Sequence, residues 1–332
     1  MSSQATQYTD LEMIMTPTEL EKAIDAAEQA GDLEALQRLG DYFEFDDNPS
    51  GAFAPSIKLK NVDVNEDAWL PPRLSGWLTK LANKRARAIR DVVFSDKLNA
   101  GHLGPLIVDE GDSWFQYPIF NEHLTDTIDI LSEAYLIKSL SAGGAELTDI
   151  VERDLYYTVI ESLKADIFLF SASGNDILGG GNVANLLIEY QSGMSVEDIV
   201  NRGEVDKVLG VITGHYETVI TRATQANPKV QIAFHGYDAP VPRKKGKALG
   251  VPLSKLDIPQ NMQLDVVRSL VRLLNERLIE VAGKYENTTH IDCRNLVGDD
   301  GSDWLFDEIH PKSEGYRKVA SKFETFITSV KD

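Results

Sequence analysis

The pattern of apolar and polar positions changes near Leu103. Downstream of this residue, short apolar runs alternate with segments of helical periodicity. The runs have the length of strands and cover residues 106–109, 134–140, 165–171, 230–235 and 289–293. The helical segments lie near residues 121–132, 146–163, 183–225 and 261–284, and a last one follows Pro311 and runs to about Val330. Short apolar strands separated by helices predict an α/β fold, in which helices cover both faces of a parallel sheet.

Two segments of this region are unusually long. Residues 183–225 exceed a single crossover, so they predict two helices and leave open a cap over the site. Residues 239–259 are rich in proline and contain Arg243-Lys244-Lys245, and they predict a long loop. Long loops in compact domains are often functional.

Before Leu103 the pattern is helical. Thr16 and Glu19 form a capping box around Pro17, which predicts the start of a helix. Gly31-Asp32 interrupts the periodicity, and a second short helix continues to Phe43. This arrangement is typical of a helical hairpin.

A further helix is predicted from about Pro72 to Val93, after an irregular stretch at residues 45–65. We interpret its basic residues as a solvated face paired with the chain's own carboxylates, rather than as a docking site for an acidic partner. They are Lys80, Lys84, Arg85, Arg87 and Arg90. The chain is therefore predicted to consist of an N-terminal helical extension, residues 1–100, and a larger domain, residues 101–332.

Composition narrows the class of protein. The 332 residues include 42% hydrophobic and 26% charged residues, close to globular averages. The net charge of −19 repels phosphate backbones, so nucleic acid is not expected as a partner. A single cysteine, Cys293, excludes an intrachain disulfide, which suits a reducing compartment. The polar N-terminus is unlike a signal peptide, and no apolar run approaches membrane-helix length. These features predict a cytoplasmic protein without an integral membrane segment.

At or after the end of each apolar run stands a polar or small residue that could take part in chemistry. Active sites of open parallel sheets gather outside the carboxyl ends of the strands, so these positions are expected to converge on one edge. They are Ser113, Gly143-Gly144, Asn175, His235, Asp307 and His310.

These residue types suit nucleophilic catalysis. A serine hydroxyl such as that of Ser113 needs a base to take its proton, and a carboxylate orients that base. Asp307 and His310 are three residues apart, which places both side chains on the same face of a tight turn. The Ser113 amide, a glycine amide and the Asn175 side chain could stabilise an oxyanion.

In this order, four blocks of sequence resemble the GDSL/SGNH hydrolase superfamily. The blocks are Gly111-Asp112-Ser113, Gly143-Gly144, Gly174-Asn175-Asp176 and Asp307-x-x-His310-Pro311. The resemblance covers about residues 103–330. It implies a flavodoxin-like three-layer α/β/α sandwich with a central parallel five-stranded sheet.

The resemblance also implies residue roles, with no metal and no cofactor. Ser113 would be the nucleophile, with Asp307 and His310 completing the triad, and Ser113, a glycine and Asn175 would form the oxyanion hole. We assign the glycine as Gly144, because the sequence from Gly144 to Leu147 resembles a turn entering a helix, and Gly143 is the alternative.

One departure concerns the substrate. Trp114 stands where the superfamily's name-giving leucine would be, so substrate assignments transfer poorly. Trp114, Tyr117 and His235 are candidate substrate-binding residues. Core packing is an equal alternative for the aromatic residues, and a structural role is an equal alternative for the histidine.

The sequence thus predicts a serine esterase that hydrolyses an acylated small molecule, lipid or sugar through an acyl-enzyme intermediate. An acyltransferase would use the same triad. A third alternative is a non-catalytic scaffold that binds a protein partner through the N-terminal helices. The sequence leaves the oligomeric state open.

Overall fold

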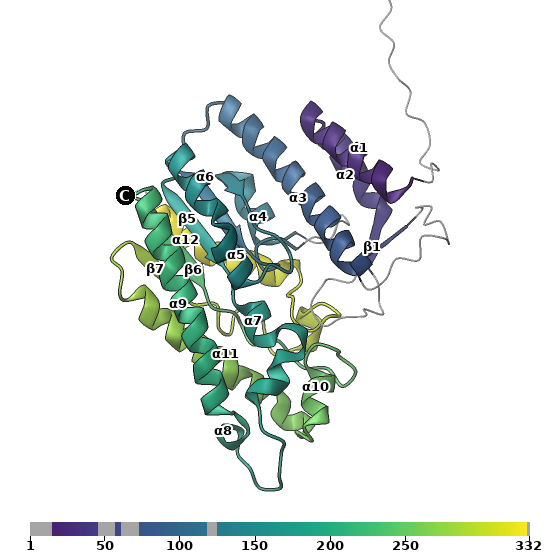
Figure 1. Cartoon of the computed structure of the whole chain (residues 1–332), viewed down its shortest axis with the longest axis vertical. Helices are drawn as coiled ribbons and strands as arrows, with labels where there is room; N and C mark the ends of the chain where they lie inside the picture. The colour runs from purple at the N-terminus through teal and green to yellow at the C-terminus, as the bar shows by residue number, and fades with distance from the viewer. Residues whose placement is uncertain (1–14, 46–56, 61–72, 118–124, 331–332) are drawn as a thin grey trace, which may run out of the picture.

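A parallel sheet of five strands lies between the helices of the larger domain (Figure 1). The computed structural model describes residues 15–45, 57–60, 73–117 and 125–330. The strands are β3 (Leu106–Gly111), β4 (Leu136–Ser139), β5 (Ile167–Ser171), β6 (Gln231–His235) and β7 (Thr288–Ile291). Each lies within or overlaps one of the five apolar runs, so the predicted strands are confirmed.

The strand order is β4-β3-β5-β6-β7, which is the order of a flavodoxin-like doubly wound sheet. β5 is buried along its whole length because it lies in the middle of the sheet and is covered on both faces. Its partner β3 is buried from Ile107 onward. This burial explains why both strands read as nearly continuous apolar runs.

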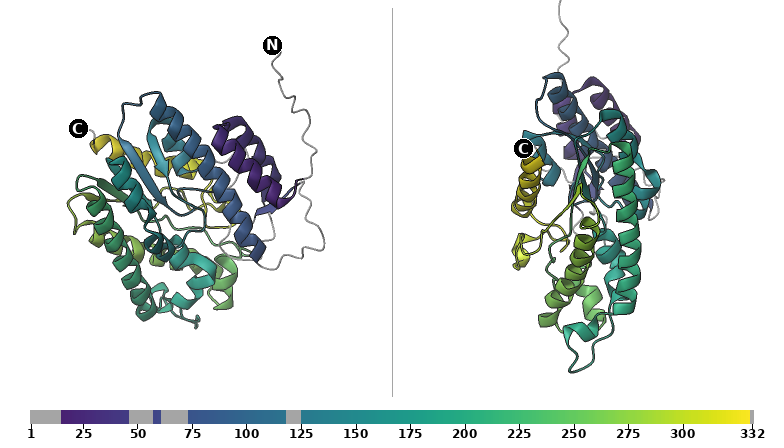
Figure 2. Two further views of the ribbon diagram at one scale, coloured as in Figure 1. Left: turned by 45° about the horizontal axis from the view of Figure 1, so that its top comes forward. Right: turned by 90° about the vertical axis from the view of Figure 1, so that its left-hand side faces the viewer.

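Helices cover both faces and make three layers (Figure 2). On one face, α4 (Thr127–Ala134) packs against α12 (Ser313–Val330). On the other, α9 (Arg202–Ala226) packs against α5 (Leu147–Arg153), α6 (Leu155–Leu163) and α11 (Gln260–Ala282). The predicted α/β/α sandwich is confirmed.

The remaining helices are short. They are α7 (Gly174–Leu178), α8 (Val196–Ile199) and α10 (Gly250–Lys255), with 3₁₀ helices at Leu39–Tyr42, Gly179–Leu186 and Gly301–Asp303. Residues 183–225 thus contain two α-helices, as predicted, and the longer of them, α9, packs in the sandwich. None of the helices in the described ranges is long and apolar enough to cross a membrane.

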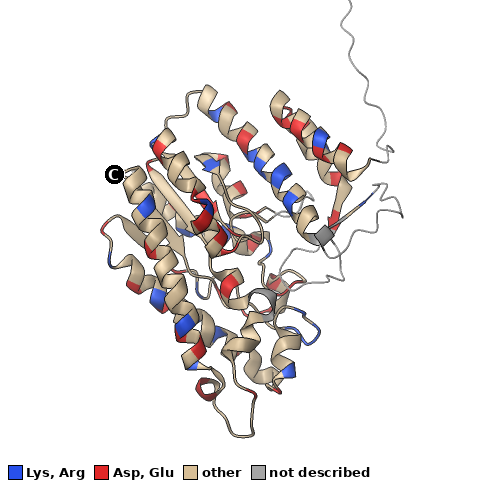
Figure 3. Cartoon of the chain, viewed as in Figure 1, with Lys and Arg blue, Asp and Glu red and all other residues tan. Residues whose placement is uncertain are grey.

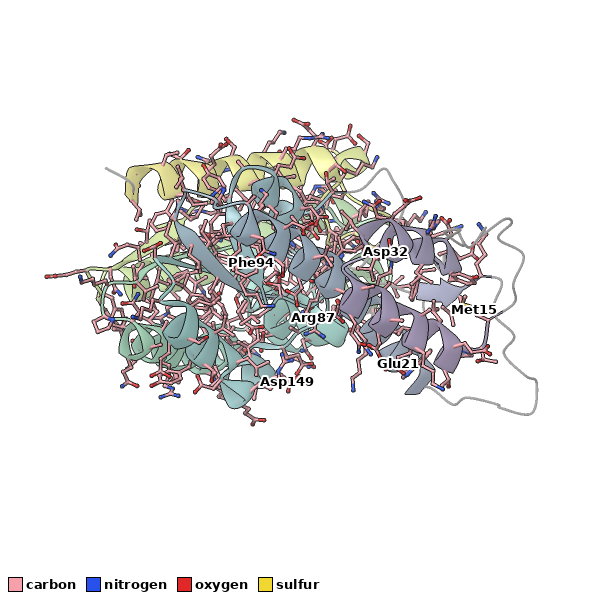
Figure 4. The ribbon with its side chains drawn as sticks, turned by 90° about the horizontal axis from the view of Figure 1, so that it is seen from above. Met15, Glu21, Asp32, Arg87, Phe94 and Asp149 are labelled. Carbon is pink, nitrogen blue, oxygen red and sulfur yellow. The ribbon has the colours of Figure 1, made fainter. Side chains whose placement is uncertain are left out.

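The N-terminal part builds a second, smaller apolar cluster. It comprises α1 (Pro17–Ala30), α2 (Leu33–Arg38), β1 (Phe43–Phe45), β2 (Ile57–Leu59) and α3 (Arg73–Asn99). The capping box at Thr16 forms as predicted. Helix α1 ends at Ala30 and is capped by Gly31, whose φ of 65° lies in the left-handed region. In Figure 4, α3, which carries Arg87 and Phe94, lies between the hairpin α1–α2 and the sandwich.

Several sequence expectations are corrected. Phe43 does not end a helix but begins β1, which pairs antiparallel with β2 inside the stretch expected to be irregular. The predicted helix 146–163 breaks at Asp154, which has a φ of 49°. The predicted loop 239–259 contains α10. The helix expected at 121–132 begins at Thr127, and residues 118–124 lie outside the described residues.

Of the five basic residues named on α3, Lys84 and Arg90 pair with acidic groups of the same chain, so the prediction holds for these two. Figure 3 shows the basic positions along the helix. Lys84 bonds Asp25 on α1 at 2.6 Å. Arg85 and Arg90 are not on a solvated face, because both side chains are buried. Arg85 donates to backbone carbonyls of Leu36 and Gln37, and Arg90 reaches carboxylates beside the sandwich. These residues therefore fasten α3 to both of its neighbours.

Candidate active site

Ser113 lies just beyond the carboxyl end of β3. Gly111 ends the strand in tight contact with β5, where an added Cβ would meet the Ser171 carbonyl oxygen at 2.5 Å. The chain then turns, and Ser113 Oγ comes to rest 2.5 Å from Nε2 of His310. Both side chains are buried, so the pair is largely shielded from bulk water.

Asp307 completes a continuous hydrogen-bonded chain. His310 Nδ1 lies 2.8 Å from Asp307 Oδ2, and Oδ1 of the same carboxylate accepts the backbone amides of Ile309 and His310. Burial alone would raise the pKa of Asp307, but the charge of His310 and hydrogen bonds from His310 and Tyr117 outweigh it and lower that pKa. The carboxylate is therefore charged at neutral pH and oriented toward the imidazole.

Glu308 secures the turn that carries Asp307 and His310. Its φ of 74° is unfavourable for a residue with a side chain. The Glu308 carboxylate accepts the backbone amides of Ala248, Leu249 and Gly250 at 2.9 to 3.1 Å, and that of Arg243 as well. The predicted loop 239–259 is thus bound directly to the turn that carries Asp307 and His310, a contact that sequence spacing could not indicate.

Two backbone amides of the motif residues are free to donate. Among the described residues, the amides of Ser113 and Gly144 have no hydrogen-bond partner. The Gly143 amide, by contrast, donates to Asn83 Oδ1 at 2.8 Å. Of the two glycines, Gly144 is therefore the one whose N–H remains available.

Asn175 enters the site from the start of α7. Its side-chain nitrogen donates to the Ala145 carbonyl at 2.8 Å, which uses one of its two N–H groups. Asn175, Ser113 and His310 line the same small cavity, and Trp114 and Tyr237 also contribute to its wall. Its free volume is about 20 Å³, close to that of one water molecule.

A buried polar cluster lies around Asp112, the residue before Ser113. Asp112 accepts the Trp114 amide at 3.0 Å, the Ser171 hydroxyl at 2.9 Å and the Tyr237 hydroxyl. Burial raises the pKa of Asp112. Tyr237 lies in the stretch that follows β6, where the sequence predicts pocket-lining residues, whereas no sequence signal distinguished Ser171 at the end of β5. The cluster joins the ends of β3, β5 and β6.

The three candidate substrate residues have different positions. Trp114 lines the cavity. Tyr117 does not, and instead its hydroxyl donates to Asp307 Oδ2 at 2.9 Å while its ring lies 4.6 Å from that of His310. His235 is fully buried, with Nε2 at 2.8 Å from Ser171 Oγ and Nδ1 at 2.9 Å from the Gly236 carbonyl. Burial lowers its pKa to about 4, which fits the structural alternative rather than substrate contact.

The described residues contain no cluster of three or more histidine, cysteine or acidic side chains suited to a metal ion. Cys293 is buried, and burial raises the pKa of its thiol, so the thiol is held in its unreactive protonated form.

Comparison with known proteins gives a family match. The model of the GDSL-like lipase/acylhydrolase family matches residues 110–318. A search of curated proteins found no match.

Solved structures with a similar fold include three hydrolases, each 14% identical to this chain. An extracellular lipase from Streptomyces rimosus has a TM-score of 0.48, and 67% of this chain aligns with 99% of it. A phospholipase A1 from Streptomyces albidoflavus aligns over the same shares, with a TM-score of 0.46. A carbohydrate esterase from Talaromyces cellulolyticus, with a TM-score of 0.44, aligns over 69% of this chain and 99% of its own.

Proposed function

The chain belongs to the GDSL-like lipase/acylhydrolase family and is an ester-hydrolysing serine hydrolase, and from this premise we propose that Ser113, His310 and Asp307 form its catalytic triad. The observation that carries the proposal is the unbroken contact from Ser113 Oγ through the His310 ring to the Asp307 carboxylate, at 2.5 and 2.8 Å. Ser113 comes from the end of β3 and Asp307 and His310 from one turn far along the chain, yet the three side chains meet in an arrangement that suits acyl transfer.

In the first half of the reaction, Ser113 Oγ attacks the ester carbonyl while its proton passes to His310 Nε2. Asp307 stabilises the imidazolium that forms. The negative charge on the carbonyl oxygen is stabilised by the amides of Ser113 and Gly144 and by the free N–H of Asn175. His310 then gives its proton to the leaving alcohol, and an acyl-Ser113 ester remains.

In the second half, water replaces the alcohol. His310 takes a proton from the water, and the resulting hydroxide attacks the acyl carbonyl. Collapse of the second tetrahedral intermediate returns the proton to Ser113 Oγ and releases the carboxylic acid. The same groups act in both halves, so a variant of any triad residue is expected to impair both.

We propose that the acyl group is short. The cavity beside Ser113 is narrow, with a free volume of about 20 Å³, and Trp114 and Tyr237 are buried side chains of its wall. An acetyl group requires the least widening of this space, whereas a long chain would require these aromatic side chains to move. The alcohol part is not specified by the cavity. The cytoplasmic location expected from the sequence stays a prediction.

The test is turnover of p-nitrophenyl esters by the purified protein. We expect acetate to be cleaved faster than octanoate, and Ser113→Ala to lose activity by at least 10³-fold, on the order seen for triad residues. Ser302→Ala, a change at an exposed serine, is the matched control. Unchanged turnover in Ser113→Ala would exclude this nucleophile. A fluorophosphonate probe should label wild type and not Ser113→Ala, whereas no labelling of a folded wild type would favour the scaffold alternative.

The acyltransferase alternative is tested in the same assay. Adding an alcohol acceptor would divert the acyl group from water, and product analysis would reveal a new ester. We expect free acid as the main product with and without the acceptor.

A further inference from the structure

We propose that Asn83, on helix α3, is a positioning residue that aims the oxyanion-hole amide of Gly144. This inference rests on the proposed function of the site. Asn83 lies outside the matched family region, which begins at residue 110. Its carboxamide bonds Gly143, a residue of the loop that follows β4. Asn83 Nδ2 donates to the Gly143 carbonyl at 2.9 Å, and Asn83 Oδ1 accepts the Gly143 amide at 2.8 Å.

The first of these bonds fixes the direction of the Gly144 N–H. The carbonyl of Gly143 and the N–H of Gly144 belong to one planar trans peptide, so they point in opposite directions. Holding the carbonyl toward α3 therefore turns the N–H away from α3. Nothing else among the described residues bonds either group.

The loop needs such a restraint because of its sequence. Two consecutive glycines flank this peptide, and Gly144 has a φ of 79°. Glycine adopts positive and negative φ about equally well, so the peptide between Gly143 and Gly144 can rotate with little steric cost. A rotated peptide would present a carbonyl oxygen where an N–H donor is required. Asn83 selects the productive orientation.

The orientation of the Asn83 carboxamide is itself determined by its neighbours. Arg90 can only donate, so Gln116 must turn its oxygen toward Arg90 Nη1, at 2.8 Å. Gln116 Nε2 then faces Asn83 Oδ1 at 3.0 Å. This leaves Asn83 Nδ2 to face the Gly143 carbonyl. The series starts at the buried Asp126 carboxylate, which anchors Arg90.

The same series reaches the nucleophile. Gln116 lies three residues after Ser113, and Asp126 also accepts the amide of Tyr117, whose hydroxyl bonds Asp307. Helix α3 thus contacts both the oxyanion loop and the segment that carries Ser113. Its two polar side chains there, Asn83 and Arg90, are both buried.

The test compares Asn83→Ala with Leu81→Ala. Leu81 is buried on the same helix but belongs to the N-terminal apolar cluster, so its loss destabilises α3 without touching the loop. For Asn83→Ala we expect kcat for p-nitrophenyl acetate to fall ~10- to 100-fold with KM changed by less than about threefold, because a misdirected oxyanion donor weakens transition-state stabilisation. Leu81→Ala should lower Tm and leave kcat within about twofold of wild type.

Hydrogen exchange gives a readout that does not depend on turnover. A peptide spanning residues 141–147 should exchange faster in Asn83→Ala than in wild type or Leu81→Ala, since the Gly143 amide loses its acceptor. If Asn83→Ala does not fold, the isosteric variant Asn83→Asp replaces it in the kcat measurement, because an ionised aspartate cannot donate to the Gly143 carbonyl. It should show the same fall in kcat.

Two results would overturn the proposal: kcat within twofold of wild type in the folded Asn83 variants, or unchanged exchange of residues 141–147 in Asn83→Ala. A wild-type protein that cleaves no ester would refute the esterase function instead, and the exchange measurement would still decide whether Asn83 anchors the loop.

Discussion

At the scale of single residues, two buried carboxyl groups differ in their protonation at neutral pH. Asp307 keeps its charge because His310 and Tyr117 bond it. Glu110, one residue before Gly111, is buried, and burial raises its pKa to about 8. The nearby charge of Arg153 opposes this shift without cancelling it. One carboxyl therefore serves as a fixed charge, and the other is held neutral at pH 7.

We predict that Tyr117→Phe lowers kcat/KM roughly tenfold. The phenol donates one of the hydrogen bonds that stabilise the Asp307 carboxylate, and a hydrogen bond to a charged group contributes about 1.5–3 kcal/mol. The ring remains, so packing against His310 is retained. Steady-state turnover is the measurement, with Tyr157→Phe, a change at a hydroxyl bonded only to Glu161 on the surface of α6, as the control. Equal kcat/KM in Tyr117→Phe and wild type would contradict the prediction.

We also predict a pH-dependent effect of Glu110→Gln on stability. The native carboxyl holds its proton up to pH about 8, whereas the unfolded one loses it near its ordinary value of 4.5. Between these values the native state binds more protons, so the stability of wild type falls as pH rises. Glutamine removes this dependence. The Tm of the variant relative to wild type should rise from pH 5 to pH 9, by an amount worth on the order of 3 kcal/mol. Parallel Tm curves would contradict it.

At the scale of elements, the site depends on contacts between segments far apart in sequence. Glu308 shows this most directly, because its carboxylate accepts four amides of the segment from Arg243 to Gly250. Gly246 packs so closely on this carboxylate that an added Cβ would lie 1.7 Å from it. The loop and the triad turn therefore form one unit.

We predict that Glu308→Ala lowers stability by about 3 kcal/mol or more, because it leaves several buried amides without an acceptor. Activity should fall as well, since the turn with Asp307 and His310 loses its anchor. Thermal melting and ester turnover are the measurements. Glu314→Ala, which removes an exposed carboxylate at the start of α12, should change neither. A Glu308→Ala protein with wild-type Tm would show that the loop is held by other contacts.

The elements differ in how far the sequence could predict them. The five strands and the capping box at Thr16 depend on local periodicity and short spacing, so they were found. The pairing of β1 with β2 was missed because the two strands are short and separated by residues 46–56. Helix α10 was missed because it is only six residues long and contains a glycine and a proline, which are typical of a loop.

The same reasoning applies to the site. Ser113, Asn175 and the pair Asp307/His310 could be predicted because each lies in a short motif next to a strand end or a turn. Ser113, His310 and Asp307 contact one another, and Asn175 lines the same cavity as Ser113 and His310, while their catalytic roles remain proposals. Asn83 could not be found, because it is 60 residues from its partner Gly143 and sits in an ordinary helical pattern. Only the packing of α3 beside β4 reveals it.

At the scale of the whole molecule, α3 connects the N-terminal hairpin to the sandwich. Its apolar side, with Leu81 and Val92, packs in the N-terminal cluster. Its other contacts lie along β4, the strand at one edge of the sheet. An edge strand needs such a cover, because its unpaired backbone groups would otherwise be open to other chains. Helix α3 therefore serves the sandwich as much as the hairpin.

This position gives a prediction about the proposed division at residue 100. Deleting residues 1–60 removes the hairpin and leaves α3, so we expect a destabilised protein with measurable esterase activity. Deleting residues 1–100 also removes Arg90, and the buried Asp126 carboxylate then lacks its partner, which costs about 3–5 kcal/mol. The cover of β4 and the contact of Asn83 with Gly143 are lost in the same deletion. We expect the protein lacking residues 1–100 to aggregate, or to have a far lower Tm and at least tenfold lower kcat than the protein lacking residues 1–60. Thermal melting and turnover of both truncations measure this. If the two truncated proteins have equal Tm and equal kcat, the sandwich is complete without α3. If the protein lacking residues 1–100 shows the predicted losses, the catalytic unit begins at α3 and not at Leu103.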